Sequence, residues 1–173
     1  GELSKDLWIT SSDDFSSWGG GDSIYHTEDL EDLIKAVDYI SMHTYPYHNT
    51  HYNPAFWKTP NDIKNDTDKE KIDQAMLRAL NFTKNQYKAV SDYVKSIGVK
   101  KPIHIGETGW ATISNGHYGA NGSRATDEYK QGLYYKSVRN WSNKNNITCF
   151  YFEAFDEHWK DANNPKGSEN NFG

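Results

Sequence analysis

A glutamate stands directly behind an apolar, β-branched run in the segment KPIHIGETGW, residues 101–110. The run predicts a strand from Pro102 to Gly106, so we expect Glu107 at the carboxyl end of that strand with its carboxylate directed into a cleft. Glycines on both sides leave room for a ligand, and Trp110 offers an aromatic ring nearby. A carboxylate in this setting suits acid–base or nucleophilic chemistry on a bound molecule. The competing interpretation is a solvated glutamate at a strand end.

More polar and aromatic side chains accompany three further strand-like runs, at residues 7–10, 39–43 and 147–152. The carboxyl ends of parallel strands meet on one face, so these side chains are expected around one cleft. The first run is followed by Ser11, Ser12, Asp13 and Asp14; the second ends in or is followed by His43, Tyr45 and Tyr47; and the third leads into Glu153, Asp156, Glu157 and Lys160.

Helical patterns lie between the four predicted strands. Apolar residues from Leu30 to Val37 follow helical spacing behind Thr27, a residue type favoured as an N-cap. A longer apolar stripe from Ile72 to Ile97 ends at Gly98, and a third pattern covers residues 129–141. Strands that alternate with helices predict parallel strands joined by right-handed crossovers, which is the α/β class.

Two α/β architectures compete for this pattern. A doubly wound nucleotide-binding sheet places a glycine-rich phosphate turn between a strand and its helix, but WGGGDS, at Trp18 to Ser23, has neither the dinucleotide nor the Walker spacing. We expect a flexible loop there. A barrel instead gathers polar side chains at the carboxyl ends of successive strands, as this sequence does. Because 173 residues are too few for most complete (β/α)8 barrels, the sequence predicts one partial domain, residues 1–173, that forms about half of a TIM barrel.

Composition and charge exclude several classes of partner. The net charge is -5 and no block of lysines or arginines could follow a phosphate backbone, so nucleic acid is excluded. No apolar stretch approaches the length of a membrane span. His43, His48 and His51 match no zinc-binding spacing, and neither a metal nor a cofactor is expected. Aromatic residues make up 14% of the chain, which suits sugar binding and equally a tyrosine-rich surface.

Three ordered motifs resemble glycoside hydrolase family 17, the β-1,3-glucanases and related glucosyltransferases built on an eight-fold β/α barrel. The motifs are IGETGW at 105–110, YFEAFDEHWK at 151–160 and SENNFG at 168–173. The aromatic-Pro-aromatic end of the family's sixth strand is matched by residues 45–47. The resemblance covers nearly the whole chain from the fifth strand onward, and it implies that the chain supplies roughly strands 5 to 8 of the barrel.

The resemblance also implies roles for individual residues. Glu107 corresponds to the nucleophile, whereas the family's acid/base glutamate, at the end of the fourth strand, has no counterpart in this chain. The half of the barrel that carries it is expected in the same molecule or in a second chain. Glu153, inside an apolar strand, is expected to orient other site groups. Core packing is the competing explanation for the rings, above all for Tyr47 and Trp159. The residues expected to bind substrate are Tyr45, Trp110, Glu157, Lys160, Glu169, His43 and Asp13.

The activity implied by the resemblance is retaining endo-β-1,3-glucan hydrolysis of a laminarin-like polysaccharide through a covalent glycosyl-enzyme intermediate. Such an enzyme uses two carboxyl groups roughly 5–5.5 Å apart. A transglycosylase with the same intermediate is a close alternative, and a non-catalytic glucan-binding half-barrel is an alternative from another class. A polymeric substrate implies action outside the cytoplasm, by a secreted, periplasmic or cell-surface protein.

Overall fold

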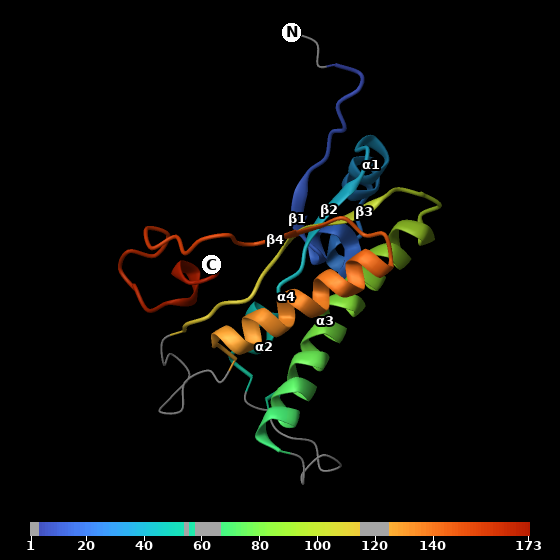
Figure 1. The fold of residues 1–173 in the computed structure, drawn as a ribbon. Helices are drawn as coiled ribbons and strands as arrows, with labels where there is room; N and C mark the ends of the chain where they lie inside the picture. The colour runs from blue at the N-terminus through green and yellow to red at the C-terminus, as the bar shows by residue number, and fades with distance from the viewer. Residues whose placement is uncertain (1–3, 54–55, 58–66, 115–124) are drawn as a thin grey trace. The chain divides into compact units, whose positions relative to one another are not determined.

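The computed structural model describes residues 4–53, 56–57, 67–114 and 125–173 (Figure 1). Strands and helices alternate along the chain as expected. Interleaved segments form two compact units. The first unit contains Gly1–Thr44, Thr83–Glu107 and Ser142–Phe150, and the second contains Tyr45–Phe82, Thr108–Trp141 and Tyr151–Gly173.

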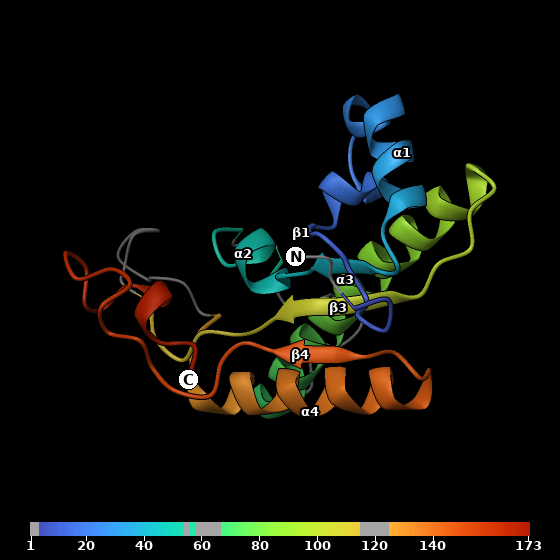
Figure 2. The ribbon, with the colours of Figure 1, turned by 90° about the horizontal axis from the view of Figure 1, so that it is seen from above.

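Strands that are consecutive in the sequence are neighbours in a four-stranded sheet, in the order β1-β2-β3-β4 (Figure 2). Both β1 with β2 and β2 with β3 pair in parallel. The backbone N–H of Ile105 donates to Thr148 and that of Phe152 donates to Thr108, so the same direction continues into the last strand. The predicted parallel α/β arrangement is therefore confirmed. The strands are β1 (Ser12–Asp14), β2 (Ile40–His43), β3 (Ile103–Thr108) and β4 (Cys149–Tyr151).

The pairing of β2 with β3 contains a register shift. Met42 lies opposite Ile105, whereas the next residue, His43, lies opposite Glu107. Such irregularities change where a side chain points at a strand end. Here the shift sets the last residue of β2 beside the penultimate residue of β3.

The core of the first unit forms on one face of this sheet, against the helix α1 (Glu28–Ala36) and part of α3 (Asp68–Ser96). Successive strand side chains point to opposite faces, so Ile40 and Met42 of β2 are both fully buried on the helical side. The buried core residues are Trp18, Leu30, Ile34, Val37, Ile40, Met42, Val90, Tyr93 and Val94.

The helix ends agree with their predicted signals. The Thr27 hydroxyl accepts a hydrogen bond of 3.2 Å from the Leu30 backbone N–H, so Thr27 is the N-cap of α1. Gly98 follows α3 with φ of 74°, in the left-handed region that favours glycine behind a helix. The last long helix, α4, covers Glu128–Lys144. None of the helices within the described residues is long and apolar enough to cross a membrane.

Aromatic rings form the core of the second unit. Tyr47, carried by the short helix α2 (Pro46–Thr50), is fully buried, as are Trp110 and Tyr134. The Tyr47 ring centroid lies 5.6 Å from that of Trp110 and 5.7 Å from that of Phe172, and both pairs pack edge to face. This geometry is favoured between aromatic rings. Core packing is therefore the role of Tyr47.

The first strand lies later in the chain than predicted. Residues 7–10 form no strand, and Trp8 is 64% exposed. The backbone of Ile9 is bonded elsewhere: its N–H donates to the Asp38 carboxylate at 2.7 Å, and its carbonyl accepts from the Asp38 N–H at 2.8 Å. Strand pairing therefore begins only at Ser12.

The prediction of a flexible loop at Trp18 to Ser23 is wrong for its first part. Trp18 is 1% exposed, and its indole N–H donates to the Ser41 carbonyl at 3.0 Å. Gly19 has φ of 82°, and a Cβ there would lie 2.1 Å from the Tyr93 ring, so glycine permits close packing at this position.

The short helical turns are η1 (Ser16–Gly20), η2 (Ser23–Tyr25) and η4 (Ser168–Asn170).

Candidate active site

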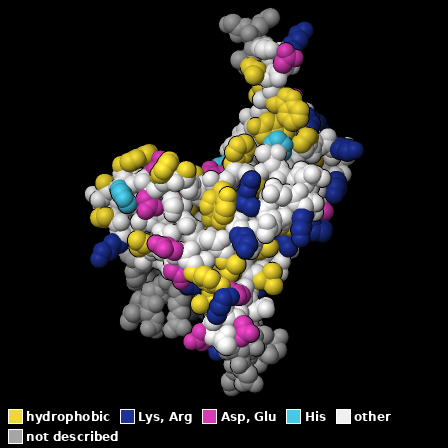
Figure 3. Space-filling view, in the orientation of Figure 1, with side chains coloured by type: hydrophobic (Ala, Val, Ile, Leu, Met, Phe, Trp, Pro, Cys, Tyr) yellow, Lys and Arg dark blue, Asp and Glu magenta, His cyan; other side chains and the backbone are white. Residues whose placement is uncertain are grey.

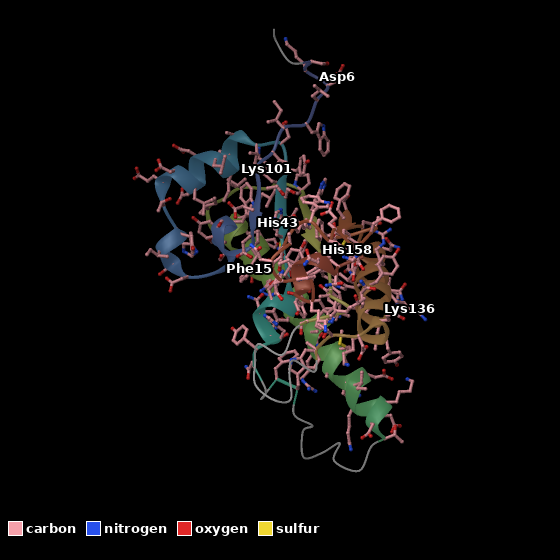
Figure 4. All side chains as sticks on the ribbon, turned by 90° about the vertical axis from the view of Figure 1, so that its left-hand side faces the viewer. Asp6, Phe15, His43, Lys101, Lys136 and His158 are labelled. Atoms are coloured by element: carbon pink, nitrogen blue, oxygen red, sulfur yellow. The ribbon has the colours of Figure 1, made fainter. Side chains whose placement is uncertain are left out.

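Glu107 and His43 lie together at the carboxyl ends of β3 and β2; His43 is labelled in Figure 4. The imidazole Nδ1 is 3.5 Å from Glu107 Oε2. The His43 and Glu107 side chains are 27% and 33% exposed, so both are accessible to a ligand yet partly shielded from water. Partial shielding strengthens an electrostatic contact of this kind. Proximity of these two strand ends is what the sequence predicts.

Two serine hydroxyls continue the row of polar groups behind His43. Ser12 Oγ lies 2.7 Å from His43 Nε2 and 2.8 Å from Ser41 Oγ. The Ser41 side chain fits because residue 106 is glycine: a Cβ on Gly106 would lie 1.9 Å from Ser41 Oγ. The row therefore runs from Ser41 through Ser12 and His43 to Glu107, and all of it lies in the first unit.

The sequence places Ser12 among the polar residues expected around the cleft but gives it no partner, and it does not single out Ser41. Ser12 and Ser41 are direct partners in the β1–β2 register. Alternation along β2 places Ser41 and His43 on the same face, away from the buried Met42. That period-two pattern was the available signal, but the register that brings Ser12 to His43 is not a local property of the sequence.

Asp13 does not join this row, and its role as a substrate-binding residue stays a prediction. It neighbours Ser12 in β1, and successive strand side chains point to opposite faces. Its Oδ1 accepts from the Asp14 N–H at 2.7 Å and from the Ser17 hydroxyl at 3.2 Å. The carboxylate thus serves the turn that follows β1.

A lysine between two carboxylates follows β4 in the second unit. Lys160 Nζ is 2.6 Å from Glu157 Oε2 and 3.5 Å from Glu153 Oε2. It also lies 3.7 Å from the centroid of the Phe152 ring, a cation–π contact. The peptide bond between Phe152 and Glu153 is cis. Glu153 is the least exposed of the three charged groups, at 10% of its side chain.

Glu153, Glu157 and Lys160 shift one another's pKa values. Burial raises the pKa of Glu153, and the neighbouring Glu157 raises it further, while Lys160 opposes both. The hydrogen bond from Lys160 lowers the pKa of Glu157. Burial alone would lower the pKa of Lys160, but the two carboxylates outweigh that effect and raise it. An ammonium–carboxylate pair therefore stands beside a carboxyl that takes up a proton readily, a set of donors and acceptors suited to sugar hydroxyls.

Tyr45 and Glu169, both expected to bind substrate, lie in the second unit as well. The Tyr45 ring packs edge to face on Phe172, with centroids 5.9 Å apart. The Glu169 side chain is 56% exposed, and its Oε1 lies 3.9 Å from His48 Nε2. Among the described residues, no group of three or more His, Cys, Asp or Glu side chains is placed to hold a metal ion.

The two tryptophans lie in opposite environments. Trp110 is fully buried, its indole N–H donates to the Ala125 carbonyl at 2.8 Å, and its ring has no face open to a sugar. Its prediction as a substrate-binding residue is therefore wrong. Trp159, for which core packing was the competing explanation, is 72% exposed. Apolar side chains also reach the surface at several places on the face shown in Figure 3.

Parallel strands that carry carboxylates at their ends are typical of barrel enzymes. Residues 8–173 match the BtgE/BtgC glycoside hydrolase domain, and the chain belongs to this family.

Solved structures and a curated relative agree with this membership. An endo-laminarinase from Formosa Hel1_33_131 is 61% identical with a TM-score of 0.94, over 99% of this chain and 44% of that one. A glycoside hydrolase family 17 β-1,3-glucanosyltransferase from Rhizomucor miehei shares the fold, at 20% identity and a TM-score of 0.59, over 96% of this chain and 45% of that one. A glucan 1,3-beta-glucosidase of Arthroderma benhamiae is 41% identical over 61 residues, which is 34% of this chain and 18% of that protein.

These matches confirm two expectations from the sequence. The resemblance to family 17 glycoside hydrolases is confirmed, and so is the α/β fold class with four strands of a partial TIM barrel. The chain spans less than half the length of each of these three proteins.

Proposed function

We propose that the protein is a retaining β-1,3-glucan hydrolase in which Glu107 is the nucleophile. The observation that carries this proposal is the position of Glu107, at the end of a parallel strand with its carboxylate partly exposed and in contact with His43. Membership of a glycoside hydrolase family supports it, as does 61% identity to an endo-laminarinase.

In the proposed first step, a carboxylate oxygen of Glu107 attacks the anomeric carbon while the bond to the leaving oxygen breaks. An acid/base carboxyl protonates that oxygen and then deprotonates the incoming water, which cleaves the glycosyl-enzyme bond and frees Glu107. Retaining enzymes hold these two carboxyl groups about 5–5.5 Å apart. We place the acid/base, with the remaining strands of the barrel, in a part of the enzyme outside these residues.

The polar groups of the second unit are proposed to bind glucan hydroxyls. Lys160 and Glu157 offer a donor and an acceptor at a fixed separation, and Glu153 holds Lys160 from its more buried side. Tyr45 and Glu169 add a phenol and an exposed carboxylate. No cofactor enters the proposed reaction.

Hydrolysis is preferred to sugar transfer because the relative with 61% identity is an endo-laminarinase, whereas the glucanosyltransferase is similar in fold alone. Both reactions pass through the same intermediate and differ in whether water or another sugar accepts the glycosyl group. Their products therefore separate them: longer oligosaccharides formed from a single oligosaccharide substrate would identify a transferase.

The decisive experiment compares the complete enzyme with its Glu107→Gln variant on laminarin. We expect reducing-end release to fall at least about a thousandfold, because a nucleophile acts with its partners as one unit. The matched control is Glu128→Gln, at an exposed position on α4, which should keep full activity. Chemical rescue of Glu107→Gly by azide, with an activated β-glucoside, should give the α-glucosyl azide. Equal cleavage by the Glu107→Gln variant and the parent enzyme would exclude Glu107 as the nucleophile.

A large polysaccharide is normally met outside the cytoplasm, so we also propose that the enzyme acts there, as a secreted, periplasmic or surface protein. Fractionation of cells with an antibody to the enzyme tests this. Recovery of all the enzyme in the cytoplasmic fraction would refute it.

A further inference from the structure

We propose that Ser12 and Ser41 position His43 so that its Nδ1–H points at the Glu107 carboxylate. His43 would then be a positioning residue for the nucleophile, fixed by a relay of two hydroxyls. This inference rests on the proposed function only in calling Glu107 the nucleophile.

The relay is a continuous row of four polar groups from three neighbouring strands. Ser41 Oγ is 2.8 Å from Ser12 Oγ, which is 2.7 Å from His43 Nε2, and His43 Nδ1 is 3.5 Å from Glu107 Oε2. The first two distances are those of good hydrogen bonds, and the third is long. Catalytic hydrogen bonds are often long before substrate binds and shorten in the complex.

Hydrogen-bond chemistry gives this row one direction when His43 is neutral. An ionised carboxylate only accepts hydrogen bonds, so the contact with Glu107 requires the proton of His43 on Nδ1. Nε2 is then an acceptor, and the Ser12 hydroxyl must donate to it. The Ser12 oxygen can in turn accept from Ser41. The carboxylate, which can only accept, selects the Nδ1–H tautomer, and the two hydroxyls hold the ring in the orientation in which this proton faces Glu107.

Three independent features of the sheet make the row possible. The register shift after Met42 sets His43 opposite Glu107. Ser41 is 7% exposed, and a buried hydroxyl needs a partner, which Ser12 supplies. Gly106 leaves the space that Ser41 Oγ occupies.

The proposed contact would act in both steps of the reaction. In the first, a fixed hydrogen bond at one carboxylate oxygen orients Glu107 for attack on the anomeric carbon. In the second, the bond between that carbon and Glu107 breaks and the electron pair returns to the carboxylate, where the Nδ1–H stabilises the charge that forms. Loss of the relay should therefore lower kcat more than it raises KM.

The first test is the tautomer of His43 in the complete enzyme, read by long-range ¹H–¹⁵N NMR with labelled histidine. Near neutral pH we expect the Nδ1–H form. A wild-type enzyme that holds the Nε2–H form would overturn the inference, and this reading needs no variant and so does not depend on whether a variant folds.

The second test uses matched substitutions in β1. Ser12→Ala frees the imidazole to turn away from Glu107, so it should give a mixture of tautomers and about a tenfold fall in kcat on laminarin, with KM changed by less than about twofold. Ser12→Thr keeps the hydroxyl and should restore both readings, while Ser11→Ala, one position earlier, should change neither. An unchanged kcat in a folded Ser12→Ala enzyme would refute the positioning role.

The outcomes also separate the two proposals. If Glu107→Gln remains active while His43 holds the Nδ1–H form, the relay stands and the nucleophile assignment fails. If Glu107→Gln is inactive while His43 holds the Nε2–H form, the nucleophile assignment stands and the relay fails.

Discussion

Ser41 Oγ fills the space into which a side chain at Gly106 would extend: a Cβ there would lie 1.9 Å from Ser41 Oγ and 3.1 Å from Ser12 Oγ. Gly106→Ala must therefore push the Ser41 hydroxyl out of the relay. We expect a loss of about 1–3 kcal/mol in the free energy of unfolding, as for other overpacked sites. Denaturant unfolding measures this loss, and kcat should fall in the same variant because His43 loses its support.

The double variant Ser41→Ala/Gly106→Ala is the control for that prediction. It removes the oxygen that clashes, so it should recover part of the stability lost on Gly106→Ala, but not the lost kcat. A double-mutant cycle isolates the coupling between contacting positions. Strictly additive losses would mean that the two positions do not collide.

Gly19 and Gly98 separate a backbone penalty from a packing clash. Both have positive φ, of 82° and 74°. A Cβ on Gly19 would lie 2.1 Å from the Tyr93 ring, whereas a Cβ on Gly98 would meet nothing within 4 Å. Gly98→Ala should therefore cost only about 1–2 kcal/mol of left-handed strain. Gly19→Ala should cost about 1–3 kcal/mol more because of overpacking.

Unfolding of the two variants under the same conditions measures the difference. Tyr93→Leu added to Gly19→Ala should remove much of the extra loss. Equal losses at the two glycines would show that the Tyr93 ring yields without cost.

Local signals in the sequence were enough for the three longer helices, α1, α3 and α4, and for three strands, but they did not predict α2. These signals depend only on residues close together in the sequence, so the tertiary structure does not override them. They are the Thr27 cap, the glycine at 98 and the apolar stripe between 72 and 97. The predicted strand at 7–10 failed because its apolar pattern gave no sign that Asp38, far along the chain, bonds both backbone groups of Ile9.

The site was predictable to the same extent. The end of the apolar run at Gly106 predicted the position of Glu107, and the parallel arrangement of neighbouring strands predicted that His43 lies close to it. The link through Ser12 required the register between β1 and β2, which no local pattern encodes. The closeness of Trp110 to Glu107 in the sequence suggests a substrate contact, but the Trp110 side chain is fully buried in the aromatic core of the second unit.

Glu153 and Glu157 should respond to pH with opposite sign. Burial first, and then Glu157, raise the pKa of Glu153, so the folded state binds its proton more tightly than the unfolded state. Stability then falls as pH rises from the unfolded pKa through the folded one. The pKa of Glu157 is lowered by Lys160, so its contribution is present above the unfolded pKa and is lost as pH falls through the folded one.

Urea unfolding of the Glu153→Gln and Glu157→Gln enzymes between about pH 3 and about pH 8 measures both effects against wild type. Glu153→Gln should be neutral or stabilising at neutral pH and should match wild type in acid. Glu157→Gln should destabilise at neutral pH and lose this effect in acid. If Glu153→Gln destabilises at neutral pH as strongly as Glu157→Gln, then Glu153 is ionised and favourably paired in the folded enzyme.

Asn170, in the SENNFG motif, stabilises the loop between Asp161 and Asn170 through side-chain hydrogen bonds. It is fully buried; its Oδ1 accepts from the Asp161 N–H at 2.8 Å, and its Nδ2 donates to the carbonyls of Asp161 and Asn164 at 2.9 and 3.0 Å. Asn170→Ala leaves buried groups without partners and should cost about 1–3 kcal/mol. Because Glu169 is its neighbour, KM for laminarin should rise as well.

Asn163→Ala, at an exposed position in the same loop, is the control and should stay within about 0.5 kcal/mol of wild type. Thermal unfolding and laminarin kinetics on both variants check these expectations. A stable Asn170→Ala enzyme with normal KM would show that the loop holds its shape without the amide.

Trp159 and Trp110 should show opposite phenotypes. Trp159 is 72% exposed, so Trp159→Ala should change stability by no more than about 0.5 kcal/mol. If its ring stacks on a glucosyl unit, worth about 1 kcal/mol, laminarin binding should weaken about fivefold. Trp110→Phe removes the indole donor to Ala125 inside the core and should cost about 1–3 kcal/mol, with little change in the affinity of the folded enzyme.

Calorimetric titration with laminari-oligosaccharides, beside thermal unfolding, reads both properties on the same samples. Mutation of a buried ring alters affinity only through the fraction of folded enzyme, so the affinity of Trp110→Phe at low temperature should equal that of wild type. If fully folded Trp110→Phe binds more weakly while Trp159→Ala binds as wild type does, then Trp110 and not Trp159 contacts the sugar. That result would contradict the burial of the Trp110 ring.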